Sequence, residues 1–136
     1  MPDYFTVENF RVSVERRRNA RGAFVSVSEA VVKLEVAGEE IHSVATGNGP
    51  VNALDAALRK DLGKYSAAIA DLRLADYKVR ILTTGTEAVT RVMIESIDGR
   101  GNRWSTVGVS ANIVDASFEA LTDSVTYKLF KDGVSP

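Results

Sequence analysis

The sequence predicts an α+β fold made of two β-β-β-α units that arose by internal duplication. The first observation is a repeat in which residues 47–58 align with residues 107–118, so that Asn52 falls on Asn112. The second is that residues 28–36 align upstream with residues 86–94. The third is that a helical pattern follows only the third strand of each unit. Two copies are too few for a solenoid, so the repeat indicates a duplicated supersecondary unit.

The first unit begins with a predicted strand over Phe10–Glu15, where apolar and polar residues alternate. Four arginines lie in the next segment, residues 16–22. A phosphate-binding patch and a solvated hairpin loop are the two interpretations. We favour the loop, because acidic residues flank it and only Phe24 offers a nearby aromatic ring. Two further strands are predicted over Ala30–Val36 and Glu40–Thr46.

A glycine-rich turn, Gly47–Gly49, leads into the first helix. We interpret it as a turn that small residues or residues tolerant of a left-handed conformation accept. Pro50 suits the first helical position, where its missing N–H costs nothing. The helix is predicted to end at about Leu62, and its apolar positions recur at helical spacing: Val51, Leu54, Leu58 and Leu62. Such a helix start leaves N–H groups free for a small anion, although a plain strand-to-helix connection explains the same pattern.

The second unit follows a link, residues 63–70, that is mostly small or polar. Its strands are predicted over Tyr77–Leu82, Ala88–Ser96 and Arg103–Val109, and its helix over Ser110–Lys131. The helix carries an apolar stripe at spacings of three and four: Val114, Phe118, Leu121, Val125 and Leu129.

We expect a single domain over residues 1–136, with unit one at about 5–63, a linker at about 64–73 and unit two at about 74–131. The order of elements argues against a ferredoxin-like β-α-β-β-α-β domain, since no helical pattern lies between the first and second strands of either unit. A unit of this size buries little surface alone and leaves sheet edges unpaired. Two units and a symmetric partner would cover that surface, so we expect a homodimer.

Composition argues against several classes of function. The chain has no cysteine and one histidine, His42, so it offers neither a thiolate nucleophile nor a two-histidine metal site. Asp55 and Asp115 both lie near predicted helix starts, where the macrodipole favours a carboxylate, so a structural role is the alternative to acid–base chemistry. We therefore expect no catalytic residue, no metal and no cofactor.

Charge and hydropathy also bear on location and macromolecular partners. A formal net charge of −1 argues against nucleic-acid binding. No apolar run approaches the length of a membrane span, and the first residues lack the pattern of a signal peptide. We expect a cytoplasmic protein that contacts no membrane.

Three motifs in order carry a resemblance that covers residues 5–131. They are residues 47–55 (GNGPVNALD), residues 74–82 (LADYKVRIL) and residues 104–117 (WSTVGVSANIVDAS). Together they resemble the C-terminal allosteric, or dimerisation, domain of the 2-isopropylmalate synthase and citramalate synthase family. The unbroken second motif and the start of the last helix look closer to citramalate synthases.

The resemblance implies two β-β-β-α units, a homodimer, and binding of an end-product amino acid that feeds back on a separate TIM-barrel domain. That barrel is an acyltransferase, absent here, that condenses acetyl-CoA with a 2-oxo acid at a divalent metal. Isoleucine is the expected effector, and leucine stays possible. A dimerisation module without an effector is the alternative, and an unrelated free-standing enzyme is a third.

The resemblance also implies which residues contact the effector. The loop that borders the effector in the family corresponds to Gly49, Pro50, Val51 and Asn52. An apolar set corresponds to Leu74, Tyr77 and Ile81, and a position at the second helix start corresponds to Ile113. Free N–H groups could hold the amino-acid carboxylate while a branched side chain fills the apolar surface. For the apolar set, ordinary core packing is the competing explanation.

Overall fold

A computed structural model describes residues 2–136, apart from the side chain of Thr84. The chain divides into two compact units, which we call the N-terminal unit (Tyr4–Ser66) and the C-terminal unit (Ala67–Pro136, with the residues before Tyr4). Each unit contains a three-stranded antiparallel sheet followed by a helix, so the α+β class and the β-β-β-α order are confirmed. That the whole chain acts as one regulatory domain stays a prediction.

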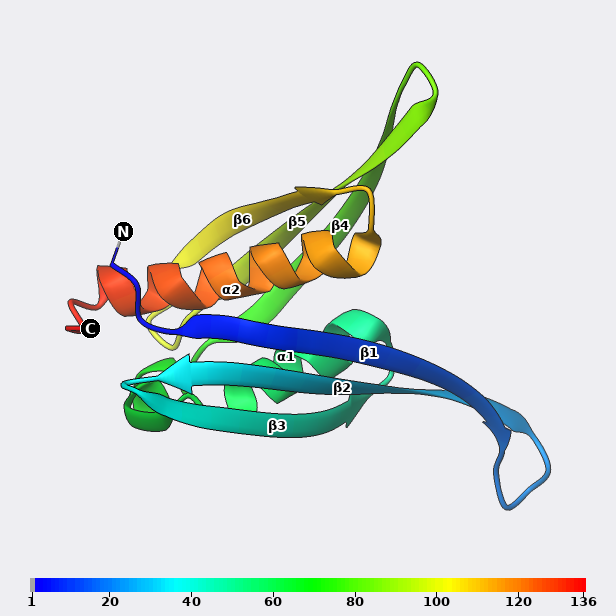
Figure 1. The fold of residues 1–136 in the computed structure, drawn as a ribbon, viewed down its shortest axis with the longest axis horizontal. Helices are drawn as coiled ribbons and strands as arrows, with labels where there is room; N and C mark the ends of the chain where they lie inside the picture. The colour runs from blue at the N-terminus through cyan, green and yellow to red at the C-terminus, as the bar shows by residue number, and fades with distance from the viewer. Residues whose placement is uncertain (1) are drawn as a thin grey trace. The chain divides into compact units, whose positions relative to one another are not determined.

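The N-terminal unit contains β1 (Thr6–Arg18), β2 (Phe24–Val36), β3 (Glu39–Gly47) and α1 (Pro50–Lys60), and the sheet order is β1-β2-β3 (Figure 1). Alternate residues of β2 lie in the core: Ala30, Val32, Leu34 and Val36. They face the buried residues of α1: Ala53, Leu54, Ala57 and Leu58. The predicted apolar faces therefore form the core of this unit.

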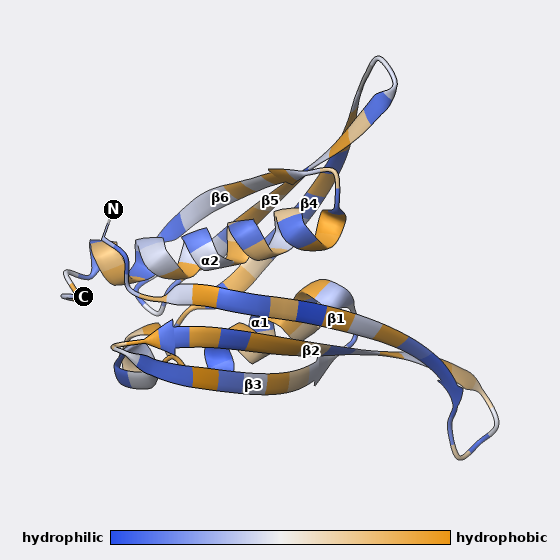
Figure 2. Ribbon diagram, viewed as in Figure 1, coloured by the Kyte–Doolittle hydropathy of each residue, from blue (hydrophilic) through white to orange (hydrophobic). Residues whose placement is uncertain are grey.

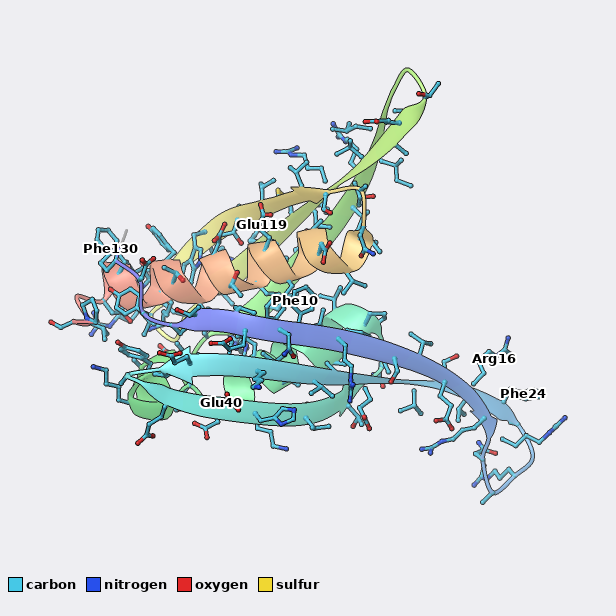
Figure 3. All side chains as sticks on the ribbon, in the orientation of Figure 1. Phe10, Arg16, Phe24, Glu40, Glu119 and Phe130 are labelled. Atoms are coloured by element: carbon cyan, nitrogen blue, oxygen red, sulfur yellow. The ribbon has the colours of Figure 1, made fainter. Side chains whose placement is uncertain are left out.

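The arginine-rich segment is partly strand, where we expected only a loop. Arg16 and Arg18 belong to β1, because the ladder continues to the pair Arg18–Phe24. Their guanidinium carbons lie 5.3 and 4.3 Å from the centre of the Phe24 ring. Such cation–π contacts cover the ring. Arg16 and Phe24 lie together near the far end of this hairpin (Figure 3).

The predicted link consists largely of 3₁₀ helix and contains the buried residues Tyr65 and Ile69. Helix α1 ends at Lys60 rather than Leu62, and two short 3₁₀ helices follow, η1 (Gly63–Tyr65) and η2 (Ala67–Ile69). Tyr65 is buried and stacks edge-on against Tyr4, with ring centroids 5.4 Å apart. The link therefore contributes to the cores instead of only joining them.

The C-terminal unit contains β4 (Arg73–Thr84), β5 (Glu87–Ile97), β6 (Arg103–Ser110) and α2 (Ile113–Lys131). Its sheet order is β4-β5-β6. In Figure 2, polar and apolar residues alternate around the turns of α2. The predicted stripe is confirmed by four buried residues (Phe118, Leu121, Val125 and Leu129) and a half-buried Val114.

Helix α2 begins at Ile113, three residues later than the predicted Ser110. The reason is the Asn112 side chain, which accepts hydrogen bonds from the N–H groups of Val114 (2.8 Å) and Asp115 (3.2 Å). An asparagine that caps in this way fixes the first turn.

Helix α2 packs closely against β6 at Gly108. A β-carbon on Gly108 would lie 1.8 Å from the carbonyl oxygen of Ala116. Beside it, Thr106 Oγ1 donates to the Ala120 carbonyl at 2.7 Å. Among the described residues, no helix combines the length and the apolar character needed to cross a bilayer.

Candidate functional site

The start of α1 carries the predicted loop Gly49–Asn52. Pro50 is the first helical residue, as predicted, and Gly49 is the N-cap, with no side chain capping the helix. The Gly49 carbonyl accepts from Ala53 N at 3.0 Å. In the described part of the chain, the N–H groups of Val51 and Asn52 have no acceptor. Two donors at the positive end of a helix are therefore free for an anion.

The two glycines of this turn differ from the prediction. Neither adopts a left-handed conformation, and Gly49 is extended, with φ −155° and ψ 172°. A β-carbon on Gly49 would meet nothing within 4 Å, so larger residues fit there. A β-carbon on Gly47 would lie 2.6 Å from the backbone nitrogen of Ala53. Close packing of β3 against α1 therefore requires glycine at position 47, and not at 49.

A β-bulge in β4 places the predicted apolar set on one face. The register shifts between Leu74 and Asp76, so Leu74 pairs with Ser96 and Tyr77 with Ile94. Without the bulge, residues three apart in a strand would point to opposite faces. Ser96 hydrogen-bonds Ser124 of α2 at 2.5 Å, which identifies this face as the one that α2 covers.

Tyr77 and Ile113 are connected through Ser117. The Tyr77 hydroxyl lies 3.2 Å from Ser117 Oγ, and Ser117 Oγ lies 2.7 Å from the Ile113 carbonyl oxygen. A serine hydroxyl has one proton, and Ser117 donates it to Ile113, so Tyr77 is the donor to Ser117. The structure thus brings two of the predicted residues to the first turn of α2.

The residues on this face become more exposed to solvent toward the end of β4. Leu74 and Tyr77 are half-buried, whereas Ile81 is 69% exposed and Ile113 is 46% exposed. Figure 1 shows the β4–β5 hairpin continuing past the start of α2. Core packing therefore does not account for Ile81 or Ile113. The loop of α1 belongs to the other unit, and its joining with this set into one effector site stays a prediction.

Two carboxylates that we placed near helix starts differ from each other. Asp115 does lie in the first turn of α2, but the first turn of α1 contains no acidic residue. Asp55 lies one turn further on, and its Oδ1 pairs with Arg59 Nε at 2.8 Å. Burial raises the pKa of Asp55, and Arg59 opposes the shift. His42 is an exposed residue of β3.

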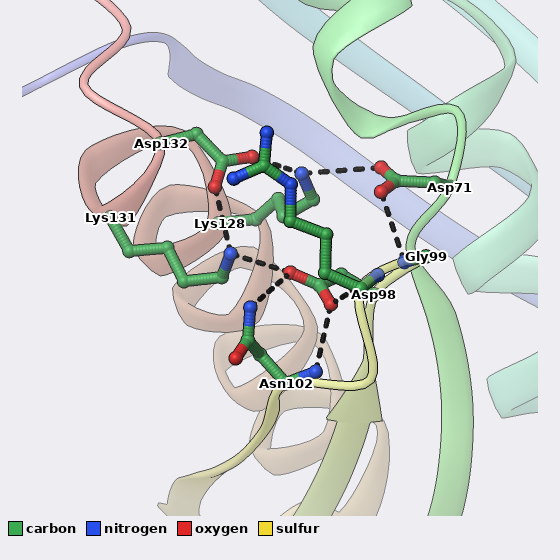
Figure 4. A network of polar contacts seen from close by, with 8 residues as sticks. Asp71, Asp98, Gly99, Asn102, Lys128, Lys131 and Asp132 are labelled. Atoms are coloured by element: carbon green, nitrogen blue, oxygen red, sulfur yellow. Dashed lines mark hydrogen bonds and ion pairs between the residues drawn. The ribbon is translucent and has the colours of Figure 1, made fainter.

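Sequence reasoning missed a cluster of ions at the end of α2, which we call the aspartate–lysine cluster (Figure 4). Asp98 is buried in the β5–β6 turn, and its Oδ2 lies 2.6 Å from Lys131 Nζ. It also accepts from the backbone N–H groups of Arg100 (3.0 Å) and Asn102 (2.9 Å). Buried Lys128 lies 3.2 Å from Asp71 and also pairs with Asp132.

The chemistry of this cluster is structural. The hydrogen bond from Lys131 is the main cause that lowers the pKa of Asp98. The hydrogen bond from the Gly99 N–H is the main cause for Asp71. Each carboxylate is thus kept ionised beside a cation. A general acid would instead need a pKa raised toward neutral pH. Among the residues that the structure describes, no group of acidic or histidine side chains could hold a metal ion.

Comparison with known proteins gives one family. Residues 1–129 match the family described as the LeuA allosteric (dimerisation) domain. (R)-citramalate synthase of Geobacter sulfurreducens is 51% identical over 130 residues, 94% of this chain and 24% of the relative. That of Aquifex aeolicus is 48% identical over 132 residues, 96% of this chain and 24% of the relative. 2-Isopropylmalate synthase of Aquifex aeolicus is 40% identical over 101 residues, 73% of this chain and 18% of the relative.

The chain therefore spans about a quarter of the length of these two citramalate synthases (24% of each). The match covers nearly the whole of the present sequence, and the similarity to citramalate synthases exceeds that to 2-isopropylmalate synthases. The resemblance carried by the three motifs is thereby confirmed. The chain belongs to the family of LeuA allosteric (dimerisation) domains.

Proposed function

We propose that this chain is the feedback-regulatory domain of a citramalate synthase, that it binds isoleucine, and that it acts as a homodimer. Leucine is the alternative effector, and in that case the synthase would be a 2-isopropylmalate synthase. The catalytic TIM barrel, which would condense acetyl-CoA with a 2-oxo acid, is the other partner of this domain. The chain alone would catalyse nothing and would need no cofactor or metal.

The observation that carries the proposal is the uncapped start of α1. An amino-acid effector has a carboxylate, and the N–H groups of Val51 and Asn52 are free donors at a positive helix end. The start of α2 is already capped by Asn112, so fewer of its N–H groups are free to bind a carboxylate. The carboxylate would therefore bind at α1.

The apolar part of the proposed site is the exposed stretch of β4. Tyr77 and Ile81 share a face by simple alternation, the bulge adds Leu74 to that face, and Ile113 is exposed at the start of α2. A branched side chain would gain from burying this surface, at about 25 cal/mol per Å² of apolar area. The higher similarity to citramalate synthases supports isoleucine over leucine.

Thermal melting with each branched-chain amino acid tests the proposal. Ligand at 100 times Kd stabilises the folded state by about 2.7 kcal/mol. For a chain of this length the melting temperature should rise by about 5–10 °C. Tyr77→Ala should lose most of the rise, and Arg18→Ala, in the β1–β2 hairpin, should keep it.

A matched pair at position 49 tests the carboxylate contact. Gly49→Asp puts a capping carboxylate on the same N–H groups, so it should compete with the effector and repel it. Gly49→Ala has room and leaves the donors free, so it should retain the rise. If isoleucine, leucine and valine all leave the melting temperature of the parent chain unchanged, the dimerisation-only function is correct instead. Light scattering at twice the chain mass checks the dimer.

A further inference from the structure

The outer face of the C-terminal sheet, which points away from α2, carries a concentration of positive charge. Tyr77 and Ser96 point toward α2, so alternation places Lys78, Arg80 and Arg91 on the opposite face. The register sets Arg80 of β4 directly opposite Arg91 of β5, and Lys78 opposite Met93. Three cationic side chains therefore share two adjacent rows of this face.

Two carboxylates of this face are paired, one with Lys78 itself and one with Arg103. Asp76 and Glu95 lie opposite each other in the next row. Asp76 Oδ2 lies 3.8 Å from Lys78 Nζ, and Glu95 Oε1 lies 2.6 Å from Arg103 Nη1. Over the residues that the structure describes, Arg80 and Arg91 have no carboxylate partner.

Two like charges directly opposite each other destabilise a sheet. The pair Arg80–Arg91 therefore lowers the stability of the unliganded sheet unless an anion lies between the two guanidinium groups. A guanidinium presents a planar fork of donors that matches the oxygens of a phosphate. Two forks and one ammonium together suit an anion with more than one negative charge.

A hollow of about 450 Å³ lies at this place, lined by Lys78, Val79, Arg80, Arg91 and Met93. Its volume falls within the range of small-molecule sites, roughly 300–1,000 Å³. Met93 adds apolar surface beside the charges, so the lining suits an anion with or without an organic part. Val79 pairs with buried Val92, so its side chain points to the α2 face. Arg16 and Arg18, at the β1–β2 hairpin, lie over the Phe24 ring.

We propose that this hollow binds a small molecule carrying a diphosphate group, either free pyrophosphate or a nucleoside diphosphate. The site uses the face of the sheet opposite to the proposed effector surface and does not depend on the effector. Arg80 and Arg91 bind the two phosphate groups, and Lys78 contributes a third positive charge.

Titration of the ¹⁵N-labelled chain with pyrophosphate, and separately with ADP, at constant ionic strength tests this site. Amide shifts should saturate and should be confined to residues 78–80 and 91–93. The double variant R80Q/R91Q should weaken the dissociation constant by about tenfold or more, because hydrogen bonds between charged groups are the strong class. Without ligand, R91Q alone should melt above the parent chain at low salt.

Arg103→Gln is the matched control, because it removes one positive charge from the same face but from a paired residue. It should leave the affinity for both ligands unchanged. Saturable shifts with either ligand that R80Q/R91Q removes support the site. Shifts confined to residues 16–24, equal loss of affinity in Arg103→Gln, or no saturable shift with either ligand would overturn it. Effector-induced melting shifts should be the same in R80Q/R91Q, so a failure here is distinct from a failure of the regulatory function.

Discussion

The contact between β6 and α2 at Gly108 allows a sharp prediction. In Gly108→Ala the new β-carbon would start 1.8 Å from the Ala116 carbonyl oxygen and 3.1 Å from Ala120 N. Both neighbours are backbone atoms, so no rotation of a side chain relieves the contact. An ordinary carbon–oxygen contact needs roughly 1.5 Å more separation, which α2 would have to supply by moving away from the sheet.

The magnitude follows from what that movement disturbs. Overpacking of a core costs about 1–3 kcal/mol of unfolding free energy. The hydrogen bond from Thr106 to Ala120, 2.7 Å long, lies at the same point and would lengthen. A weakened bond at a partly buried site adds about 1 kcal/mol. We expect Gly108→Ala to lose about 2–4 kcal/mol, equivalent to about 6–15 °C in melting temperature.

The assay is urea unfolding followed by the fluorescence of Trp104, which is the single tryptophan and lies in β6. Its signal therefore reports on the C-terminal unit. Gly49→Ala is the matched control, because a β-carbon there meets nothing within 4 Å and the backbone is extended. If Gly108→Ala unfolds at the same urea concentration as Gly49→Ala, α2 does not approach β6 as closely as the structure shows.

Three further predictions concern polar groups of the C-terminal unit. Ser124→Ala should cost about 1–3 kcal/mol because it leaves the buried Ser96 hydroxyl without its partner, whereas S96A/S124A should recover most of that loss in the same urea assay. Asn112→Ala should cost about 1 kcal/mol by removing the cap of α2, and equal stability of the variant would contradict the capping geometry. Asp98 has its pKa lowered below the ordinary 3.8, mainly by Lys131, so its stabilisation is complete above pH 3.8 and is lost as the pH falls through the lower folded value. Asp98→Asn should lower the urea midpoint at pH 7 and flatten its decline between pH 5 and 2, and an unchanged decline would count against this pair.

The strand order and both helices followed from local patterns in the sequence. Alternation in residues 30–36 and the three-and-four spacing after Val114 need only the neighbouring residues, and both were confirmed. The extension of β1 through Arg18 could not follow from hydrophobicity, because those residues are exposed and are held by backbone pairing with β2. The capping of α2 by Asn112 could have been predicted from local sequence, since asparagine is a preferred cap, but the predicted helix starts at Ser110 instead.

Other features depend on residues far apart in the chain. Asp98 and Lys131 are separated by 33 positions, so their pairing needs the packing of the β5–β6 turn against the end of α2. Tyr65 appears in a segment of small and polar residues, and its ring packs against Tyr4, 61 positions earlier in the chain. Among the expected site residues, spacing alone would have put Leu74 and Tyr77 on opposite faces. The bulge that unites them is visible only in the register of β4 against β5.

The duplication has left two similar units with differently used helix starts. In both, a glycine near the end of the third strand lets the helix approach, Gly47 in one and Gly108 in the other. The aligned asparagines have separate roles, because Asn112 caps α2 whereas Asn52 lies inside α1, after an uncapped Gly49. A capped helix start contributes stability to its own unit, and an uncapped one keeps donors for a ligand at a cost in stability. An isoleucine carboxylate should therefore contact the N-terminal unit. If an Asn112→Ala variant of the chain, instead of Gly49→Asp, abolished isoleucine binding while remaining folded, this assignment of roles to the two units would be reversed.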